Sequence, residues 1–124
     1  MIRVSDAALP LAVLACLAAA PTAKAQDAGE AVFKRYCAVC HTVEAGKNKI
    51  GPSLAGILGR KAGSVPGYSY TDANKNSGVT WDEQNLDTYL TDPKKFVPGT
   101  KMLFAGVKSD DDRKGLIAYL KQQK

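Results

Sequence analysis

The sequence predicts a single all-α domain. Apolar residues recur at helical spacing in three separate segments of the 124-residue chain, and each segment begins with a polar residue that suits a helix N-cap. No run of alternating polar and apolar residues predicts a strand, and no internal repeat is present. Hydrophobic residues make up 45% of the chain and charged residues 23%, which is typical of a small globular protein and excludes a disordered or fibrous one.

Residues 1–25 are expected to be a cleaved secretory signal peptide, with residues 26–124 as the mature domain. A basic residue precedes an almost wholly apolar stretch, and small residues allow a cut after Ala25. The stretch is shorter than the roughly 20 residues that a membrane-spanning helix needs, so no stable membrane insertion is expected. Lipidation of Cys16 is the weaker alternative. The predicted compartment is the periplasm.

The first helix of the mature domain is expected to begin at Asp27. Glu30 lies three residues later and completes a capping-box pattern. The apolar residues that follow at helical spacing are Ala31, Val32, Phe33, Tyr36 and Cys37. The helix therefore ends in the stretch CAVCH at residues 37–41, which contains two of the three cysteines and the only histidine.

Residues 42–78 are expected to form long loops with a short helical turn. Glycine is frequent, Pro52 and Pro66 interrupt the segment, and its apolar residues are the short group Leu54, Ile57 and Leu58. Loops of this length are uncommon in a compact domain unless something else organises them, and a cofactor would do so.

A second helix is expected to begin at Thr80, with Glu83 completing its capping box, and to stop at Asp92-Pro93. Its apolar face consists of Leu86, Tyr89 and Leu90.

A last helix is expected to begin at Ser109, with Asp112 three residues later in the capping position. Its apolar stripe consists of Leu116, Ile117, Tyr119 and Leu120. The connection before it, residues 97–106, is rich in turn residues and carries Met102, the only methionine besides Met1.

The CAVCH motif fits four kinds of site, and covalent haem attachment explains it best. A structural zinc site needs four ligands, whereas the mature chain offers Cys37, Cys40 and His41 with no further thiol or imidazole. A thioredoxin-like pair would lie in a strand–helix–strand unit, and a bare disulfide leaves the histidine unexplained. On a helical turn the two thiols can add to the haem vinyl groups while the imidazole reaches the iron.

Met102 is expected to be the second axial ligand of the haem iron, because it is a soft donor in a loop far from His41 in the sequence. Its alternative role is to fill a gap in the core. Ligation on both faces predicts an electron carrier and no enzyme activity. A peroxidase-like or gas-binding haem protein, with one iron face open, is the competing hypothesis.

Further motifs are spread over residues 28–122. They are CAVCHT at 37–42, GPSL at 51–54, GRK at 59–61, YSYTDANKN at 68–76, Trp81, DPKKF at 92–96, PGTKMLFAG at 98–106 and LIAYL at 116–120. Through these motifs the chain resembles the class I cytochromes c, including bacterial cytochrome c2 and mitochondrial cytochrome c. The resemblance implies their fold, with three main helices, short helical turns and long loops wrapped round one covalently attached haem c per chain.

The resemblance also implies a ligand set. Cys37 and Cys40 would bear the haem thioethers, and His41 and Met102 would be the axial iron ligands. The carbonyl of Pro52 would accept a hydrogen bond from His41 and fix the tautomer of its ring.

The resemblance assigns roles to the surrounding pocket as well. Three residues would hold a haem propionate: Arg60, Tyr70 and Trp81. Three would form a polar network beside Met102: Asn74, Tyr89 and Thr100. Gly29 and Phe33 would meet Tyr119 where the first and last helices cross.

The function implied is that of a soluble periplasmic one-electron carrier of the cytochrome c2 type. It would cycle between Fe(II) and Fe(III) haem, between a cytochrome bc complex and an acceptor such as an oxidase or a photosynthetic reaction centre. The net charge is +5, and a ring of lysines at the haem edge would steer the carrier to acidic membrane-bound partners. Nucleic acid is not an expected partner, and a monomer is the default. The ring would consist of Lys34, Lys47, Lys49, Lys61, Lys94, Lys95, Lys101 and Lys108.

Overall fold

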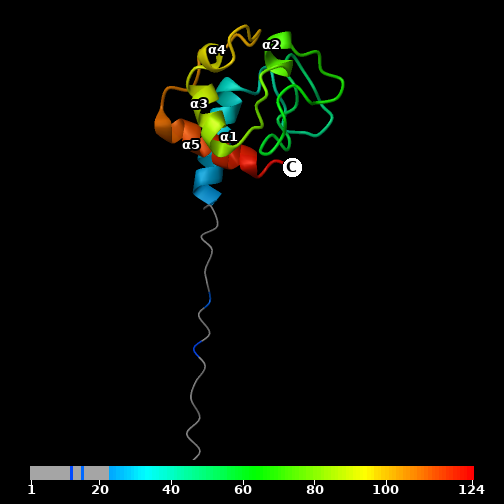
Figure 1. The fold of residues 1–124 in the computed structure, drawn as a ribbon. Coiled ribbons are helices and arrows are strands. Elements are labelled where there is room, and N and C mark those ends of the chain that lie inside the picture. The colour runs from blue at the N-terminus through cyan, green and yellow to red at the C-terminus, as the bar shows by residue number, and fades with distance from the viewer. Residues whose placement is uncertain (1–11, 13–14, 16–22) are drawn as a thin grey trace, which may run out of the picture.

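Five helices position the predicted site, joined by long loops (Figure 1). The computed structural model describes residues 12, 15 and 23–124, so most of the expected signal peptide, including Cys16, lies outside the described residues. The helices are α1 (Ala23–Tyr36), α2 (Asp72–Lys75), α3 (Glu83–Thr91), α4 (Pro93–Phe96) and α5 (Asp110–Lys121). Pairing of extended backbone in the described chain is limited to one isolated bridge, between Lys61 and Thr80. The predicted all-α fold, with three main helices and short helical turns, is confirmed.

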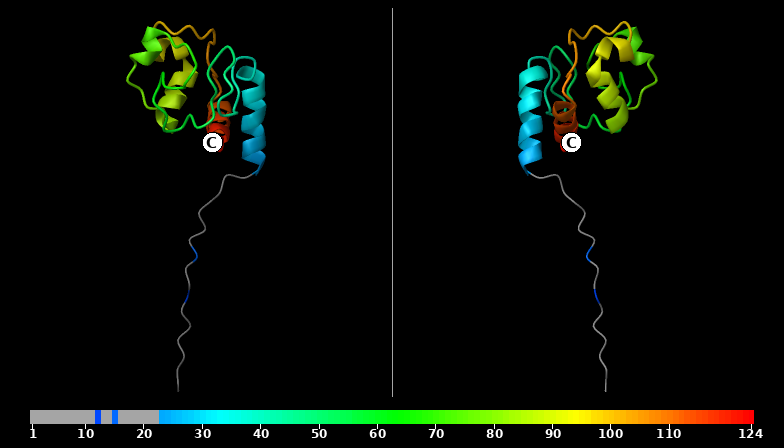
Figure 2. Two further views of the ribbon diagram at one scale, coloured as in Figure 1. Left: turned by 90° about the vertical axis from the view of Figure 1, so that its right-hand side faces the viewer. Right: turned by 90° about the vertical axis from the view of Figure 1, so that its left-hand side faces the viewer.

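α1 and α5 cross each other and form the main contact between helices (Figures 1 and 2). At the crossing the helix backbones come very close, since a Cβ atom on Gly29 would lie 2.1 Å from the carbonyl oxygen of Gly115 and 2.7 Å from Cβ of Tyr119. Beside this point the rings of Phe33 and Tyr119 pack with their centroids 5.6 Å apart. The predicted meeting of Gly29, Phe33 and Tyr119 is therefore observed.

The hydrophobic core lies between α1, α3 and α5 and also takes in side chains from the loops. Leu116 of α5 is fully buried, and the loops contribute Ile57, Ala62 and Val107. The remaining buried apolar side chains of this cluster are Val32, Phe33, Cys37, Trp81, Leu86, Leu90, Ile117 and Leu120. Because loop residues are anchored in the helical core, loop segments can hold functional side chains in fixed positions.

The predicted start of the first helix is wrong for the described chain. α1 begins at Ala23, so Asp27 lies inside the helix and caps nothing. Ala, Lys and Gln are good helix formers, and residues 23–26 consist only of these types. The helix therefore continues upstream past the expected cap.

The predicted cap of the second helix is also wrong, because Asp82 and not Thr80 is the N-cap of α3. The Asp82 carboxylate accepts a hydrogen bond from the Asn85 amide (2.8 Å), and the Asn85 side chain accepts one from the Asp82 amide (2.8 Å). Thr80 instead pairs with Lys61, which keeps residues 80–82 extended and carries Trp81 into the core. Tertiary pairing therefore decides between two overlapping capping patterns.

Two other helix boundaries agree with the prediction. Ser109 is the N-cap of α5, and its hydroxyl accepts a hydrogen bond from the Asp112 amide (3.2 Å). α3 ends at Thr91, directly before Asp92-Pro93. None of the helices in the described part of the chain is long and apolar enough to cross a bilayer.

The loops of residues 42–78 contain only α2 as helix in the described structure, which agrees with the prediction of long loops with one short helical turn. The apolar group Leu54, Ile57 and Leu58 is not helical. Polar side chains hold these loops by hydrogen bonds to backbone groups, and the sequence does not predict these bonds. Asn48 donates to the Pro66 carbonyl (3.2 Å) and accepts from the Ser53 amide (3.0 Å). The Tyr68 hydroxyl donates to the Ile50 carbonyl (2.9 Å). Loops lack the regular backbone hydrogen bonds of helices and sheets, so their backbone groups need side-chain partners of this kind.

Candidate functional site

Cys37 and Cys40 lie in the turn that directly follows α1. The His41 amide donates to the Cys37 carbonyl (2.9 Å) and the Cys37 amide donates to the Phe33 carbonyl (2.8 Å), so the turn continues the helical course of the chain. Both cysteines are free thiols. Burial, with a smaller contribution from Cys40, raises the pKa of Cys37 to about 11. Cys37 is therefore a neutral thiol at pH 7, and both sulfur atoms are available for another bond.

The orientation and proton position of the His41 ring are fixed by Pro52. Nδ1 of His41 lies 2.7 Å from the Pro52 carbonyl oxygen. Because a carbonyl only accepts hydrogen bonds, Nδ1 carries the proton and Nε2 keeps its lone pair. Burial lowers the pKa of His41; the Pro52 bond opposes this shift, and the charges of Arg60 and Lys49 reinforce it. A neutral imidazole with Nε2 unprotonated is the form that ligates metals.

Gly51 gives the His41 ring the space that it occupies. A Cβ atom on Gly51 would lie 2.3 Å from Cε1 and 2.7 Å from Nδ1 of the ring. The φ angle of Gly51 does not lie in the positive region that favours glycine, so its backbone conformation would accept other residues. The glycine is therefore required for space and not for conformation.

A Gly51→Ala variant should displace the His41 ring from the Pro52 carbonyl and lower the unfolding free energy by about 2 kcal/mol, through a steric clash and a lost hydrogen bond. Unfolding in guanidinium chloride and the NMR signal of the His41 Nδ1 proton would measure the two effects. Gly56→Ala is the matched control, because its added Cβ meets nothing within 4 Å and only the φ of +68° is strained. An unchanged His41 signal in Gly51→Ala would contradict the prediction.

Met102 lies in a second polar cluster, with Tyr89 of α3 and with Thr100. The Tyr89 hydroxyl donates to Sδ of Met102 at 3.6 Å, and the Met102 amide donates to Oγ1 of Thr100 at 3.2 Å. Burial raises the pKa of Tyr89 to about 12, and a hydrogen bond with Thr100 opposes the shift in part. The hydroxyl therefore stays protonated and oriented toward the sulfur, which retains a lone pair for a further bond.

Asn74, in α2, is near this region but forms no hydrogen bond with Tyr89 or Thr100. α2 packs against the loop before Met102, since a Cβ on Gly99 would lie 3.2 Å from Cβ of Ala73. Oδ1 of Asn74 is the one buried side-chain polar atom without a partner among the described residues. An unpaired buried acceptor costs about 1–3 kcal/mol. Its position therefore fits a site that a bound group completes.

Arg60 and Trp81 are brought together by the pairing of two extended segments. The Trp81 amide donates to the Arg60 carbonyl (2.9 Å), and the Gly59 amide donates to the Trp81 carbonyl (2.6 Å). The Arg60 guanidinium donates to the carbonyls of Ser53 (2.9 Å) and Ala55 (3.1 Å). Burial lowers the pKa of Arg60. The guanidinium is thus held in place as a half-buried positive charge, which suits an anionic partner.

Tyr70 and Trp81 each interact with Arg60. The Tyr70 hydroxyl accepts a hydrogen bond from the Val65 amide (3.1 Å) and raises the pKa of Arg60, partly opposing the effect of burial. The Trp81 ring packs against the ring of Tyr89, with centroids 4.8 Å apart. Trp81 therefore links the Arg60 cluster to the cluster that holds Met102.

The donors at the site fit a haem better than a bare metal ion. Among the residues that the structure describes, no group of three or more His, Cys, Asp or Glu side chains could hold a metal ion. One imidazole, one thioether and two thiols are the protein donors that a c-type haem uses. Two surface hollows, of about 560 and 570 Å³, are lined by residues of α3, α4 and α5 together with Asp92, Lys108 and Gln122, and by none of the predicted haem-binding residues.

Comparison with known proteins agrees with this chemistry. The family model for cytochrome c matches residues 26–124. The cytochrome c of Gibberella zeae is 61% identical over 94 residues, covering 75% of this chain and 89% of its own length. The cytochrome c2 of Blastochloris viridis is 51% identical over 113 residues, covering 90% of this chain and 88% of its own. The cytochrome c of Arabidopsis thaliana is 55% identical over 96 residues, covering 77% and 86%.

The extent of these matches confirms the predicted family, its covalently bound haem c and the absence of an enzyme activity. The chain belongs to the cytochrome c family, whose members bind haem c covalently and carry electrons between redox partners.

Proposed function

We propose that this chain is a periplasmic one-electron carrier of the cytochrome c2 type. It takes electrons from a cytochrome bc complex and passes them to a terminal acceptor, an oxidase or a photosynthetic reaction centre. The observation that carries the proposal is the pair of held donors: His41 with its Nε2 lone pair free, and Met102 with its sulfur oriented by Tyr89. With both donors bound to the haem iron, no position would remain open for a substrate.

Export of the chain is supported by its first 25 residues. They have the basic start, apolar stretch and small-residue exit of a signal peptide, with the cut after Ala25. The match to the family model begins at residue 26, directly after this cut. In the mature protein α1 would therefore begin no earlier than Gln26, so Asp27 would lie in its first turn, where a carboxylate is favourable.

The residues of the site have distinct roles in this proposal. Cys37 and Cys40 form thioethers with the haem, and His41 and Met102 ligate its iron. Bound haem supplies the one-electron chemistry by changing between Fe(II) and Fe(III). The bond from His41 to Pro52 fixes the ring tautomer and raises the basicity of the ligand.

The remaining pocket residues hold and tune the cofactor. One group, with the half-buried guanidinium at its centre, pairs with a propionate: Arg60, Tyr70 and Trp81. The other group sets the polarity beside the Met102 sulfur: Asn74, Tyr89 and Thr100.

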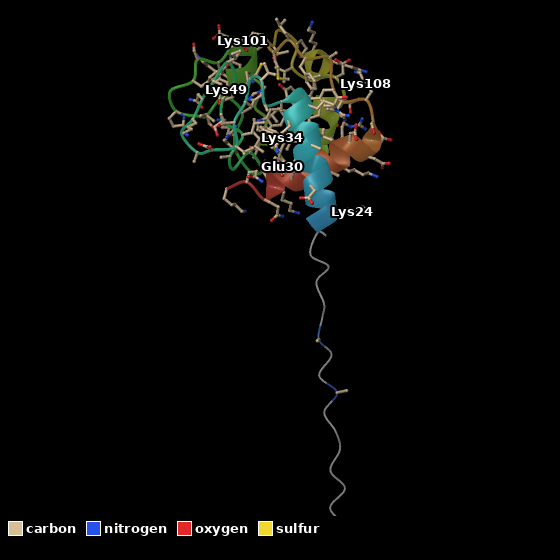
Figure 3. The ribbon with its side chains drawn as sticks, turned by 180° about the vertical axis from the view of Figure 1, so that it is seen from behind. Lys24, Glu30, Lys34, Lys49, Lys101 and Lys108 are labelled. Atoms are coloured by element: carbon tan, nitrogen blue, oxygen red, sulfur yellow. The ribbon has the colours of Figure 1, made fainter. Side chains whose placement is uncertain are left out.

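Five of the eight lysines of the predicted ring make polar side-chain contacts in the structure, and these contacts are of two kinds. Lys34 and Lys47 form ion pairs with Glu30 (3.1 Å) and Glu44 (2.6 Å), which offset their charge. Lys49, Lys101 and Lys108 donate to backbone carbonyls instead, and they spread round the upper part of the domain in Figure 3. No carboxylate pairs with these three in the described chain, so they are stronger candidates than Lys34 and Lys47 for steering toward an acidic partner.

Reduction of the carrier by a purified cytochrome bc complex should be fast and sensitive to salt. The second-order rate constant should fall by about tenfold between low and physiological ionic strength, because the Debye length shortens to about 8 Å. Lys49→Glu should slow the reaction about fivefold at low salt. Lys114→Glu is the matched control, with the same change of charge at an exposed position on α5.

A rate constant that does not change with salt would remove steering from the proposal. Equal slowing by Lys49→Glu and Lys114→Glu would show that net charge matters and the docking face does not. Ready binding of carbon monoxide to the native reduced protein at neutral pH would contradict ligation on both sides of the iron.

A further inference from the structure

The loop that carries Met102 has almost no backbone support of its own. In the part of the chain that the structure describes, no backbone–backbone hydrogen bond involves residues 101–106; the flanking ones are at Thr100 and Val107. The side chain of Leu103 is 93% exposed and anchors nothing. The position of Met102 therefore depends on a few side-chain contacts.

Lys108 makes one of these contacts, and it bridges two segments. Its ammonium donates to the carbonyl of Thr91 at 2.7 Å and to the carbonyl of Ala105 at 2.9 Å. Thr91 is the last residue of α3, and Ala105 belongs to the Met102 loop. One side chain thus ties the loop to the same helix that carries Tyr89, the donor to the Met102 sulfur.

The C-terminus of α3 suits such a bond. The last carbonyls of a helix lack intrahelical partners and carry partial negative charge, and α3 has no basic residue in its own last turn. The Val107 amide donates a hydrogen bond to the Leu90 carbonyl (2.7 Å), and the Lys108 ammonium donates one to the Thr91 carbonyl. Gly106 allows the close approach, since a Cβ there would lie 2.3 Å from the Thr91 oxygen.

We propose that Lys108 is a positioning residue for Met102: by tying the loop to α3, it prevents external ligands from replacing the methionine sulfur on the iron. The proposal rests on the proposed role of Met102 as a ligand. Lys108 pairs with no carboxylate among the described residues, so the two carbonyl bonds are its contacts. Hydrogen bonds from a charged donor are stronger than neutral ones.

The test is cyanide binding to the haem-loaded ferric protein, because cyanide reaches the iron only when the Met102 sulfur leaves. Lys108→Gln should raise the cyanide affinity by about tenfold, since the loop opens more often. Lys108→Arg keeps a charged donor and should restore most of the native affinity. Titration by visible absorbance measures all three proteins.

Lys114→Gln is the matched control. The Lys114 side chain is exposed on α5 and forms no ion pair within the described chain. The variant removes the same positive charge and should leave cyanide affinity unchanged. Unchanged affinity in Lys108→Gln, whether or not its unfolding free energy falls in guanidinium chloride, would overturn the proposal, and so would an equal rise in Lys114→Gln.

The far-red absorption of the sulfur–iron bond separates this proposal from the proposed function. If the native ferric protein lacks that band, Met102 is not a ligand, and both proposals are overturned. If the band is present and Lys108→Gln binds cyanide like the native protein, only the role of Lys108 is overturned.

Discussion

A Gly29→Ala variant is expected to lose about 3 kcal/mol or more of unfolding free energy. The added Cβ would lie 2.1 Å from the carbonyl oxygen of Gly115 and 2.7 Å from Cβ of Tyr119. Neither atom is the end of a flexible side chain, so α1 and α5 must move apart and their core contacts must loosen. Guanidinium chloride unfolding, followed by far-ultraviolet circular dichroism, measures the loss. Fluorescence of Trp81, the only tryptophan, is an independent probe.

Gly115→Ala is the control for this prediction, because it changes the partner glycine at the same crossing. Its Cβ would lie 3.6 Å from Cα of Gly29, which is ordinary van der Waals contact. Alanine is favoured over glycine within a helix by about 1 kcal/mol, so this variant should be neutral or more stable. Equal unfolding free energies of the two variants would contradict the steric clash expected at Gly29.

The helices were predictable where the signals are local. The Ser109 cap of α5 and the stop of α3 before Pro93 depend on neighbouring residues, and both are found as predicted. The cap of α3 was not predictable, because Thr80 and Asp82 each start a plausible capping box and the distant pairing of Thr80 with Lys61 decides between them. Contacts between segments remote in sequence leave no local pattern.

In the candidate site, too, local features were predictable and contacts between distant segments were not. Cys37, Cys40 and His41 are adjacent in sequence, and a helical turn accounts for their spacing. Met102 was predicted by its scarcity, as the only methionine of the mature chain. The bonds of Lys108 to two carbonyls could not be predicted, because they depend on how the Met102 loop approaches the end of α3. Only the folded chain distinguishes this lysine from a solvated one.

A Met102→Ala variant is expected to have a reduction potential about 0.2 V lower than the native protein. The thioether favours ferrous iron, and its removal opens the position to water, which favours the ferric state. For one electron, about 59 mV corresponds to a tenfold change in the equilibrium constant, so about 0.2 V corresponds to about 5 kcal/mol. Potentiometric titration measures the shift, and the far-red absorption of the sulfur–iron bond should disappear.

Two variants separate loss of the Met102 sulfur from disturbance of its surroundings. Leu103→Ala alters the adjacent side chain, which is 93% exposed, and should change neither the potential nor the far-red band. Tyr89→Phe keeps the sulfur but removes its hydroxyl donor at 3.6 Å, so the potential should shift by less than about 50 mV while the band remains. If Met102→Ala kept the far-red band, another side chain would have to be the ligand. If its potential stayed within about 30 mV of the native value, the thioether would contribute little to the reduction potential of this carrier.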